Sequence, residues 1–210
     1  MIKQGLHNIH LMNIFLLLVV VASWGFVHSL LASLVFKDFI CKTLGDGFMR
    51  VYRLGYNIFS VISFLPILWL MWVLPDQTIY IVPAPWKYLM LVGQGIGALL
   101  LLYGVLQTGP LSFMGLRQLV VPDLKPGTLV TGGLYRFVRH PLYSAGLLFL
   151  WLTATMTLNQ LVVYVSATIY IFIGAYFEER KLLREYGEEY AKYQASTPMI
   201  IPGLLLKRHK

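Results

Sequence analysis

Five long apolar stretches constrain the fold of this chain more than any other feature of its sequence. A helix needs about 20 mostly apolar residues to cross the hydrocarbon core of a bilayer. Five stretches approach that length, although the last two are somewhat short: 11–35, 56–74, 88–106, 142–157 and 161–177. We therefore predict an all-α, polytopic integral membrane protein with about five transmembrane helices.

The composition agrees with a membrane protein. The 210 residues are 58% hydrophobic and only 12% charged, with a mean hydropathy of +0.69, far from the usual soluble mixture. This length predicts a single membrane domain over 1–210, with a cytosolic part at about 107–141 and 178–203. Residues 158–160 separate the last two stretches and predict a tight helical hairpin. The first stretch resembles a signal peptide, but no small-residue cleavage site follows, so we expect a retained helix.

The basic residues predict the orientation of the chain in the membrane. The formal net charge is +8, and 15 of the 17 Lys and Arg lie in three segments that five spans place on one side: 36–55, 107–141 and the tail after 177. The positive-inside rule then puts the N-terminus outside and the C-terminus in the cytosol, as in a bacterial inner-membrane protein. Because the basic residues flank apolar runs, we expect the lipid bilayer as partner and no nucleic acid.

The single cysteine, Cys41, limits the chemistry that the chain can carry. It excludes an intramolecular disulfide, and no second thiol lies near a histidine to complete a zinc set. We therefore expect no metal site.

The tail after Phe177 changes sharply in composition. Charged residues follow one another, and apolar side chains recur at helical spacing at Leu182, Tyr186, Tyr190 and Tyr193. This pattern predicts an amphipathic helix that continues the fifth span. Its apolar stripe either lies on the membrane or folds over a cytosolic pocket.

The segment 132–143 contains the densest group of candidate binding residues. Two glycines, two arginines, a histidine and a proline stand directly before the fourth apolar stretch. Pro141 suits the first turn of a helix because its missing N–H needs no partner there. A helix start flanked by Arg139 and His140 favours a carboxylate or phosphate. An ordinary positive-inside anchor with a proline start explains the residues about equally well.

Two acidic residues, Glu178 and Glu179, stand at the cytosolic end of the fifth span. The partial negative charge of a helix C-terminus disfavours carboxylates there, so this pair can serve to hold an ammonium or a sulfonium. The alternative is a solvated start of the amphipathic helix, balanced by the basic residues of 180–184, and the pair alone favours that alternative.

Three further features are weaker when taken alone. Arg117, in the loop after the third span, can orient a substrate or stabilise a thiolate, but by itself it is a basic loop residue. His28 lies inside the first span, where an ionisable side chain is a functional candidate or a neutral histidine satisfied by a neighbouring helix. With His140 it would be the natural ligand pair for a haem. Gly93 and Gly97 permit close helix packing.

The ordered set of motifs in the C-terminal part resembles a known family. It consists of 133–135, 139–143, Glu178 with Glu179, 186–190, Pro198 and 201–202. Together these resemble the isoprenylcysteine carboxyl methyltransferase family of membrane enzymes, over about residues 107–203. Within that superfamily, 115–118, 155–157 and 173–174 resemble the bacterial methanethiol S-methyltransferases. The N-terminal part, with His28-Ser29 and 52–57, is similar to NnrU-type proteins, whose plant relatives include a haem-dependent isomerase.

The resemblance implies a methyltransferase that uses S-adenosylmethionine and receives its acceptor from the membrane. It implies that the donor is held by Leu134, Tyr135, Arg139, His140, Pro141, Tyr143, Glu178 and Glu179. Arg117 and Glu179 are the expected catalytic residues, with Arg117 on the acceptor side. The acceptor is expected to be a small or lipophilic nucleophile, with a thiol preferred and an amine or carboxylate left open. The sequence does not determine the oligomeric state.

Two other functions remain open at this point. One is a haem-binding NnrU-like protein, an isomerase or an accessory factor in nitrogen oxide metabolism, with His28 and His140 as ligands. The other is a structural membrane protein whose polar loops are only anchors.

Overall fold

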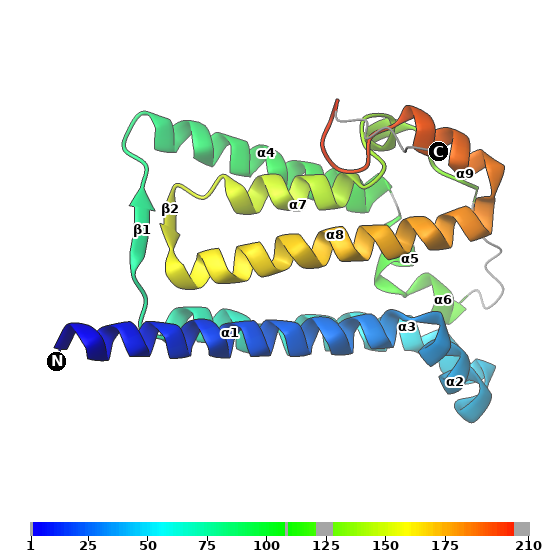
Figure 1. The fold of residues 1–210 in the computed structure, drawn as a ribbon. Coiled ribbons are helices and arrows are strands. Elements are labelled where there is room, and N and C mark those ends of the chain that lie inside the picture. Colours follow the sequence, from blue (N-terminus) through cyan, green and yellow to red (C-terminus); the bar gives the residue numbers. More distant parts are fainter. Residues whose placement is uncertain (1, 108, 121–127, 204–210) are drawn as a thin grey trace. The chain divides into compact units, whose positions relative to one another are not determined.

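The structure is a computed structural model that describes residues 2–107, 109–120 and 128–203. In chain order (Figure 1), its elements are α1 (Ile2–Ala32), α2 (Leu34–Leu44), α3 (Asp46–Val73), β1 (Thr78–Ile81), α4 (Trp86–Gln107), α5 (Pro110–Met114), α6 (Arg117–Val120), the 3-10 turn η1 (Gly133–Arg136), α7 (Pro141–Trp151), β2 (Thr155–Thr157), α8 (Leu158–Tyr186) and α9 (Glu188–Ser196).

The chain forms two compact units. The first holds residues 1–81, 109–124 and 155–167, and the second holds 82–108, 125–154 and 168–210. The single membrane domain expected over 1–210 stays a prediction. The predicted cytosolic part at 107–141 includes residues 108 and 121–127, which lie outside the described residues.

The predicted fold class is confirmed. Within the described residues, four helices are long and apolar enough to cross a membrane: α3, α4, α8 and the part of α1 from Asn8 to Ala32. The shorter apolar helix α7 follows the same pattern over fewer residues. Many large apolar side chains of the long helices are exposed, such as Phe26 and Trp72. Surfaces of that kind suit lipid rather than water.

The fourth predicted span, 142–157, is wrong in its C-terminal boundary. The helix ends at Trp151, and its 11 residues cover only about 16 Å at 1.5 Å per residue. Thr153 turns its hydroxyl back to the carbonyl of Leu150 at 2.8 Å, and Thr155–Thr157 then pair with β1 in an antiparallel sheet. β-branched residues favour that extended backbone. The all-α expectation therefore misses one short two-stranded sheet.

The first turn of α8 occupies the place where the sequence predicted a hairpin tip at 158–160. Thr157 and Gln160 form a capping box, because the Gln160 side chain accepts from Thr157 N at 3.1 Å and Thr157 Oγ1 accepts from Gln160 N at 3.4 Å. Asp76 Oδ1 accepts from Asn159 N at 3.0 Å and from Gln77 N at 2.8 Å. These contacts satisfy backbone donors that a helix start leaves unpaired.

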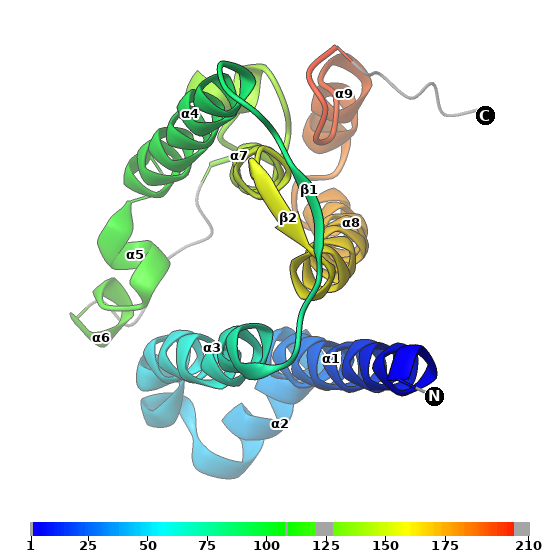
Figure 2. The ribbon, with the colours of Figure 1, turned by 90° about the vertical axis from the view of Figure 1, so that its left-hand side faces the viewer.

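The core of the first unit lies between α1, α3 and the beginning of α8. Leu17, Ile67 and Val163 are buried against one another, one from each of these helices. Trp24 on α1 also donates from Nε1 to the Ser63 hydroxyl on α3 at 3.1 Å. Hydrophobic burial and side-chain hydrogen bonds such as this one therefore set the pairing of α1 with α3, which lie side by side in Figures 1 and 2.

In the second unit, α4 and α7 pack at unusually short range, and Figures 1 and 2 show them side by side. Gly97 is buried at the crossing, where an added Cβ would lie 3.0 Å from Phe149 N and 3.2 Å from Ala145 O. Gln94 donates to Phe149 O at 2.9 Å. The close packing predicted for Gly97 is confirmed, since a Cβ at this position would press against the α7 backbone.

The amphipathic tail forms two helices rather than one. α8 runs on through the charged segment to Tyr186, as predicted, but Gly187 then adopts φ +57° and α9 begins at Glu188. Left-handed backbone of this kind favours glycine. Tyr190 and Tyr193 of α9 are buried in protein. Of the two placements left open for the apolar stripe, their burial favours folding over a pocket.

We expect Gly97→Val to destabilise the protein by about 1–3 kcal/mol, because the new methyl groups would meet the α7 backbone, which cannot move aside as a side chain can. Thermal unfolding in detergent measures the effect. Gly95→Val is the matched control, since a Cβ at Gly95 on the same helix has no neighbour within 4 Å. Equal melting temperatures for the two variants would contradict the close α4–α7 contact.

Candidate functional site

The start of α7 is covered by the chain segment that follows α9. Arg139 N donates to Pro198 O at 2.9 Å, and His140 N donates to Met199 O at 3.0 Å. Ser144 Oγ donates to the carbonyl of Ile200 at 2.5 Å. Two backbone donors that the sequence offered to an anion are thus already paired with tail carbonyls. The tail builds one wall of the site.

A buried ion pair joins the start of α7 to the end of α8. Arg139 Nε and Nη2 both lie 2.6 Å from Glu179 Oε1, and the two side chains are only 8% and 6% exposed. Arg139 Nη1 also donates to the carbonyls of Gln194, at 3.0 Å, and Thr197. The Gln194 amide donates to Glu179 Oε2 at 2.7 Å. Buried charges are tolerated only when paired and hydrogen-bonded in this way.

Glu178 has a different environment from its neighbour. Its side chain is 45% exposed, and its Oε2 accepts from Tyr143 Oη at 2.9 Å. His140 lies between the two glutamates, with Nδ1 3.6 Å from Glu178 Oε2 and Nε2 3.4 Å from Glu179 Oε1. The His140 ring also stacks on Tyr143, with centroids 5.3 Å apart. Glu178 is therefore an oriented carboxylate that still reaches solvent.

Three tyrosines, Tyr135, Tyr190 and Tyr193, lie near the buried pair of Arg139 and Glu179. Tyr193 Oη donates to Tyr135 O at 2.5 Å, which ties α9 to η1. Burial raises the pKa of Tyr193 to about 12. Burial, with the nearby Glu179 charge, also raises the pKa of Tyr190, and burial with the Glu178 charge raises that of Tyr135. All three phenols therefore keep their protons at neutral pH.

Two buried polar atoms here, Tyr190 Oη and His140 Nε2, form no well-aligned hydrogen bond among the described residues, although Tyr190 lies near Arg139 and His140 Nε2 lies 3.4 Å from Glu179 Oε1. Buried polar groups are rarely left unpaired, because the desolvation cost is about 1–3 kcal/mol. These atoms are therefore candidate contacts for a bound molecule.

A cavity of about 360 Å³ adjoins the site in the same unit. Its lining residues are Thr131, Arg136, Lys192, Tyr193, Ser196 and Thr197. Two side chains are cationic and the other four carry hydroxyl groups, so the cavity suits an anionic group. It shares Tyr193 and Thr197 with the contacts described above.

Most of the predicted donor-binding residues come together in the second unit. They surround the start of α7 and the end of α8: Tyr135, Arg139, His140, Pro141, Tyr143, Glu178 and Glu179. Leu134 is half-buried in η1, and its N–H donates to Gln107 Oε1 at 3.4 Å. Arg117 is exposed on α6 and belongs to the first unit.

The sequence did not identify Gln194, Gln107 and the tail carbonyls as parts of the site. A lone glutamine on a polar helix carries no distinctive pattern, and a backbone carbonyl carries none at all. Tyr190 and Tyr193 were recognisable only as the apolar stripe of the tail. Their burial against Arg139 and Glu179 depends on the turn at Gly187.

His28 has local partners within the first unit. Its Nε2 lies 2.7 Å from Tyr56 Oη, its Nδ1 lies 3.1 Å from Ser60 Oγ, and its ring stacks on Trp24. This agrees with a histidine satisfied by a neighbouring helix. His140, its suggested partner in haem binding, belongs to the second unit.

The comparisons with known proteins point to methyl transfer. A family model described as phospholipid methyltransferase matches residues 93–189. A methanethiol S-methyltransferase of Crocosphaera subtropica is 30% identical over 186 residues, which cover 83% of this chain and 69% of the relative. Methanethiol S-methyltransferase 2 of Bradyrhizobium diazoefficiens is 30% identical over 199 residues, 91% of this chain and 74% of the relative.

A methanethiol S-methyltransferase of Pseudomonas deceptionensis is 39% identical over 95 residues, 43% of this chain and 36% of the relative. No solved structure matches the chain. These relatives favour a methyltransferase over the haem-binding alternative. By its similarity over most of its length, the chain belongs to the family of membrane methyltransferases that includes the methanethiol S-methyltransferases.

Proposed function

We propose that the second unit binds S-adenosylmethionine and transfers its methyl group to a small thiol. The observation that carries this proposal is the contrast between the two glutamates. Glu179 is buried and fully engaged with Arg139 and Gln194, whereas Glu178 is half-exposed and held in place by Tyr143. A carboxylate that its neighbours hold in one orientation, next to a buried ion pair, suits a donor that carries a positive charge.

The residues fit such a donor. The Glu178 carboxylate would take its ammonium or its ribose hydroxyls, because it is half-exposed and oriented by Tyr143. The carboxylate of the donor would find cations in the cavity at Arg136 and Lys192. When bound, S-adenosylmethionine supplies an electrophilic methyl group on a sulfonium. Leu134, Tyr135 and Pro141 would frame the site from η1 and the first turn of α7.

In this mechanism the protein residues position the donor and the acceptor and exclude water. Opposite charges diminish when a thiolate attacks a sulfonium, so alignment and exclusion of water supply most of the acceleration, and no strong base is needed. Glu178, His140 and Tyr143 would orient the donor. Both oxygens of Glu179 accept from protein donors, so the geometry supports a positioning role for it.

The acceptor proposal rests on the relatives and on Arg117. The relatives are named methanethiol S-methyltransferases, which supports a small thiol. A free thiol ionises near pH 8.5, so a cation beside the acceptor would raise the thiolate fraction at neutral pH. Arg117 is exposed and is our candidate for that cation. The distribution of Lys and Arg supports a bacterial inner membrane with this chemistry on the cytosolic side.

Glu178→Gln should weaken binding of S-adenosylhomocysteine, the demethylated product, by roughly tenfold to a hundredfold, because a hydrogen bond to a charged group contributes about 1.5–3 kcal/mol. Calorimetric titration of the detergent-solubilised protein measures this. Glu185→Gln on the same helix is the matched control and should bind as the parent does. Absence of binding to the parent protein would reject the proposed donor.

Arg139→Gln and Glu179→Gln should each destabilise the protein by about 3–5 kcal/mol, because each leaves the other charge buried and unpaired. The double variant should lose less free energy of unfolding than the two single variants lose together, since it leaves neither charge buried and unpaired. Unfolding in detergent measures the free energy of unfolding of each variant. Additive losses would mean that the two side chains do not depend on each other.

Arg117→Ala should shift the pH dependence of methyl transfer to higher pH. If the guanidinium stabilises the thiolate, it lowers the pKa of the bound thiol, so its removal reduces activity most at low pH and least at high pH. Arg117→Lys keeps the positive charge and should restore most of the activity at neutral pH. A profile for Arg117→Ala that overlays the parent profile at every pH would exclude Arg117 from the acceptor site.

A further inference from the structure

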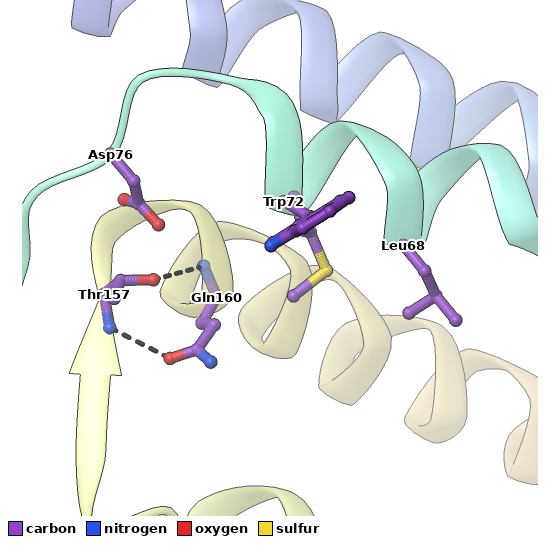
Figure 3. A pocket seen from close by; sticks show the side chains of 6 residues that line it. Leu68, Trp72, Asp76, Thr157 and Gln160 are labelled. Atoms are coloured by element: carbon purple, nitrogen blue, oxygen red, sulfur yellow. Dashed lines mark hydrogen bonds between the residues drawn. The ribbon is translucent and has the colours of Figure 1, made fainter.

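A groove of about 400 Å³ lies in the first unit, where the end of α3 faces the beginning of α8. Figure 3 shows its lining residues, which are Leu68, Met71, Trp72, Asp76, Thr157 and Gln160. None of them belongs to the candidate methyl-transfer site, which lies in the second unit. The groove therefore needs its own explanation.

One wall of the groove is apolar and belongs to a membrane-spanning helix. Leu68, Met71 and Trp72 come from the last turns of α3, which ends at Val73. Trp72 is 86% exposed, and Leu68 is also exposed. Tryptophan is enriched at the level of lipid headgroups, and a leucine one turn deeper reaches acyl chains. This wall suits the upper part of a lipid tail.

The opposite wall is polar and carries a negative charge. Asp76 Oδ1 is occupied by the backbone N–H groups of Gln77 and Asn159. Asp76 is exposed, and its second oxygen, Oδ2, accepts no hydrogen bond among the described residues, so it is open to solvent or to a ligand. Gln160 uses its carbonyl to cap Thr157 N, and its NH2 group is left to donate elsewhere. Asp76 and Gln160 therefore both line one small groove (Figure 3).

We propose that this groove binds a phospholipid with a primary-ammonium headgroup. The ammonium would pair with Asp76 Oδ2, a phosphate oxygen would accept from Gln160 Nε2, and the first part of an acyl chain would lie along Leu68 and Met71. The positive end of the headgroup complements Asp76. A purely anionic headgroup would instead meet an uncompensated carboxylate at the same place.

The lipid, rather than a free amine, is the ligand that matches both walls. A headgroup alone would leave the apolar surface of Leu68 and Trp72 uncovered. The position at the end of a spanning helix also presents the groove to lipids, which lie beside it in the bilayer. The inference does not depend on the methyl donor or acceptor.

The test uses the delipidated 210-residue chain in detergent and native mass spectrometry. The probes are dihexanoyl phosphatidylethanolamine, dihexanoyl phosphatidylglycerol and free phosphoethanolamine. We expect the parent protein to prefer the ethanolamine lipid over the glycerol lipid by roughly tenfold or more, as a charge-assisted hydrogen bond predicts. Free phosphoethanolamine should bind much more weakly. Equal binding of the two lipids would overturn the proposal, and tight binding of phosphoethanolamine would replace the lipid with a soluble amine.

Asp76→Asn removes the charge but keeps an oxygen that can accept from Gln77 N and Asn159 N, so the start of α8 should remain capped. It should abolish the preference between the two lipids, and an unchanged preference would overturn the proposal. Trp72→Ala should weaken both lipids several-fold. Trp69→Ala is its matched control, because Trp69 is 59% exposed on the same helix and does not line the groove.

Gln160→Glu is a second variant that tests the phosphate contact without disturbing Asp76. A glutamate at this position keeps the acceptor for Thr157 N and so preserves the capping box. It removes the donor for the phosphate and adds a negative charge. Both lipids should then bind several-fold more weakly, and undiminished binding would contradict the proposed orientation of the headgroup.

Discussion

The buried pair of Arg139 and Glu179 is the interaction on which the second unit depends. Its charges lie where water cannot solvate them, so each needs the other and both need hydrogen bonds. Those bonds come from α9 and from the tail, through Gln194 and the carbonyl of Thr197. One guanidinium thereby connects the start of α7 to the end of α8 and to the C-terminal end of α9 with the residue that follows it. The positions of His140 and Glu178 follow from that connection.

In this arrangement Glu179 supports the fold, whereas the adjacent Glu178 is the carboxylate proposed to bind the donor. Consecutive residues on a helix point about 100° apart, so Glu178 and Glu179 cannot serve the same purpose. Glu179 faces the protein and stabilises the fold. Glu178 faces outward, where Tyr143 and His140 restrict it without neutralising it. A site for a cationic donor needs both parts, because a carboxylate that moves freely binds with a larger loss of entropy.

The sequence predicted those features that rest on composition and short-range pattern. Apolar length identified the four long helices, and the missing side chain at Gly97 predicted a close helix contact, which the structure places against α7. The motif residues around His140 and the glutamate pair were recognised by their order along the chain. Helical periodicity in the tail placed Tyr190 and Tyr193 on one face, and both are buried.

Features that depend on tertiary contacts escaped prediction. The two threonines of Thr155–Thr157 favour extended backbone, but they do not identify β1 as the partner, because that strand lies more than 70 residues earlier. Similarly, Arg139 seemed free to bind an anion. Its guanidinium is occupied because the tail supplies carbonyl oxygens, and carbonyls are the same in every residue. Hydropathy also could not distinguish the 11-residue α7 from a full span.

The carbonyls that cover the start of α7 also have a consequence for biosynthesis. Arg139 and His140 leave the ribosome well before Pro198 and Met199, which accept their backbone hydrogen bonds. Until the segment from Gln194 to Met199 is made, the Arg139 guanidinium lacks two of its carbonyl acceptors and one wall of the candidate site is absent. The helices can therefore enter the membrane while the binding site is still incomplete. The proposed donor site is therefore completed only after the membrane segments have been synthesised.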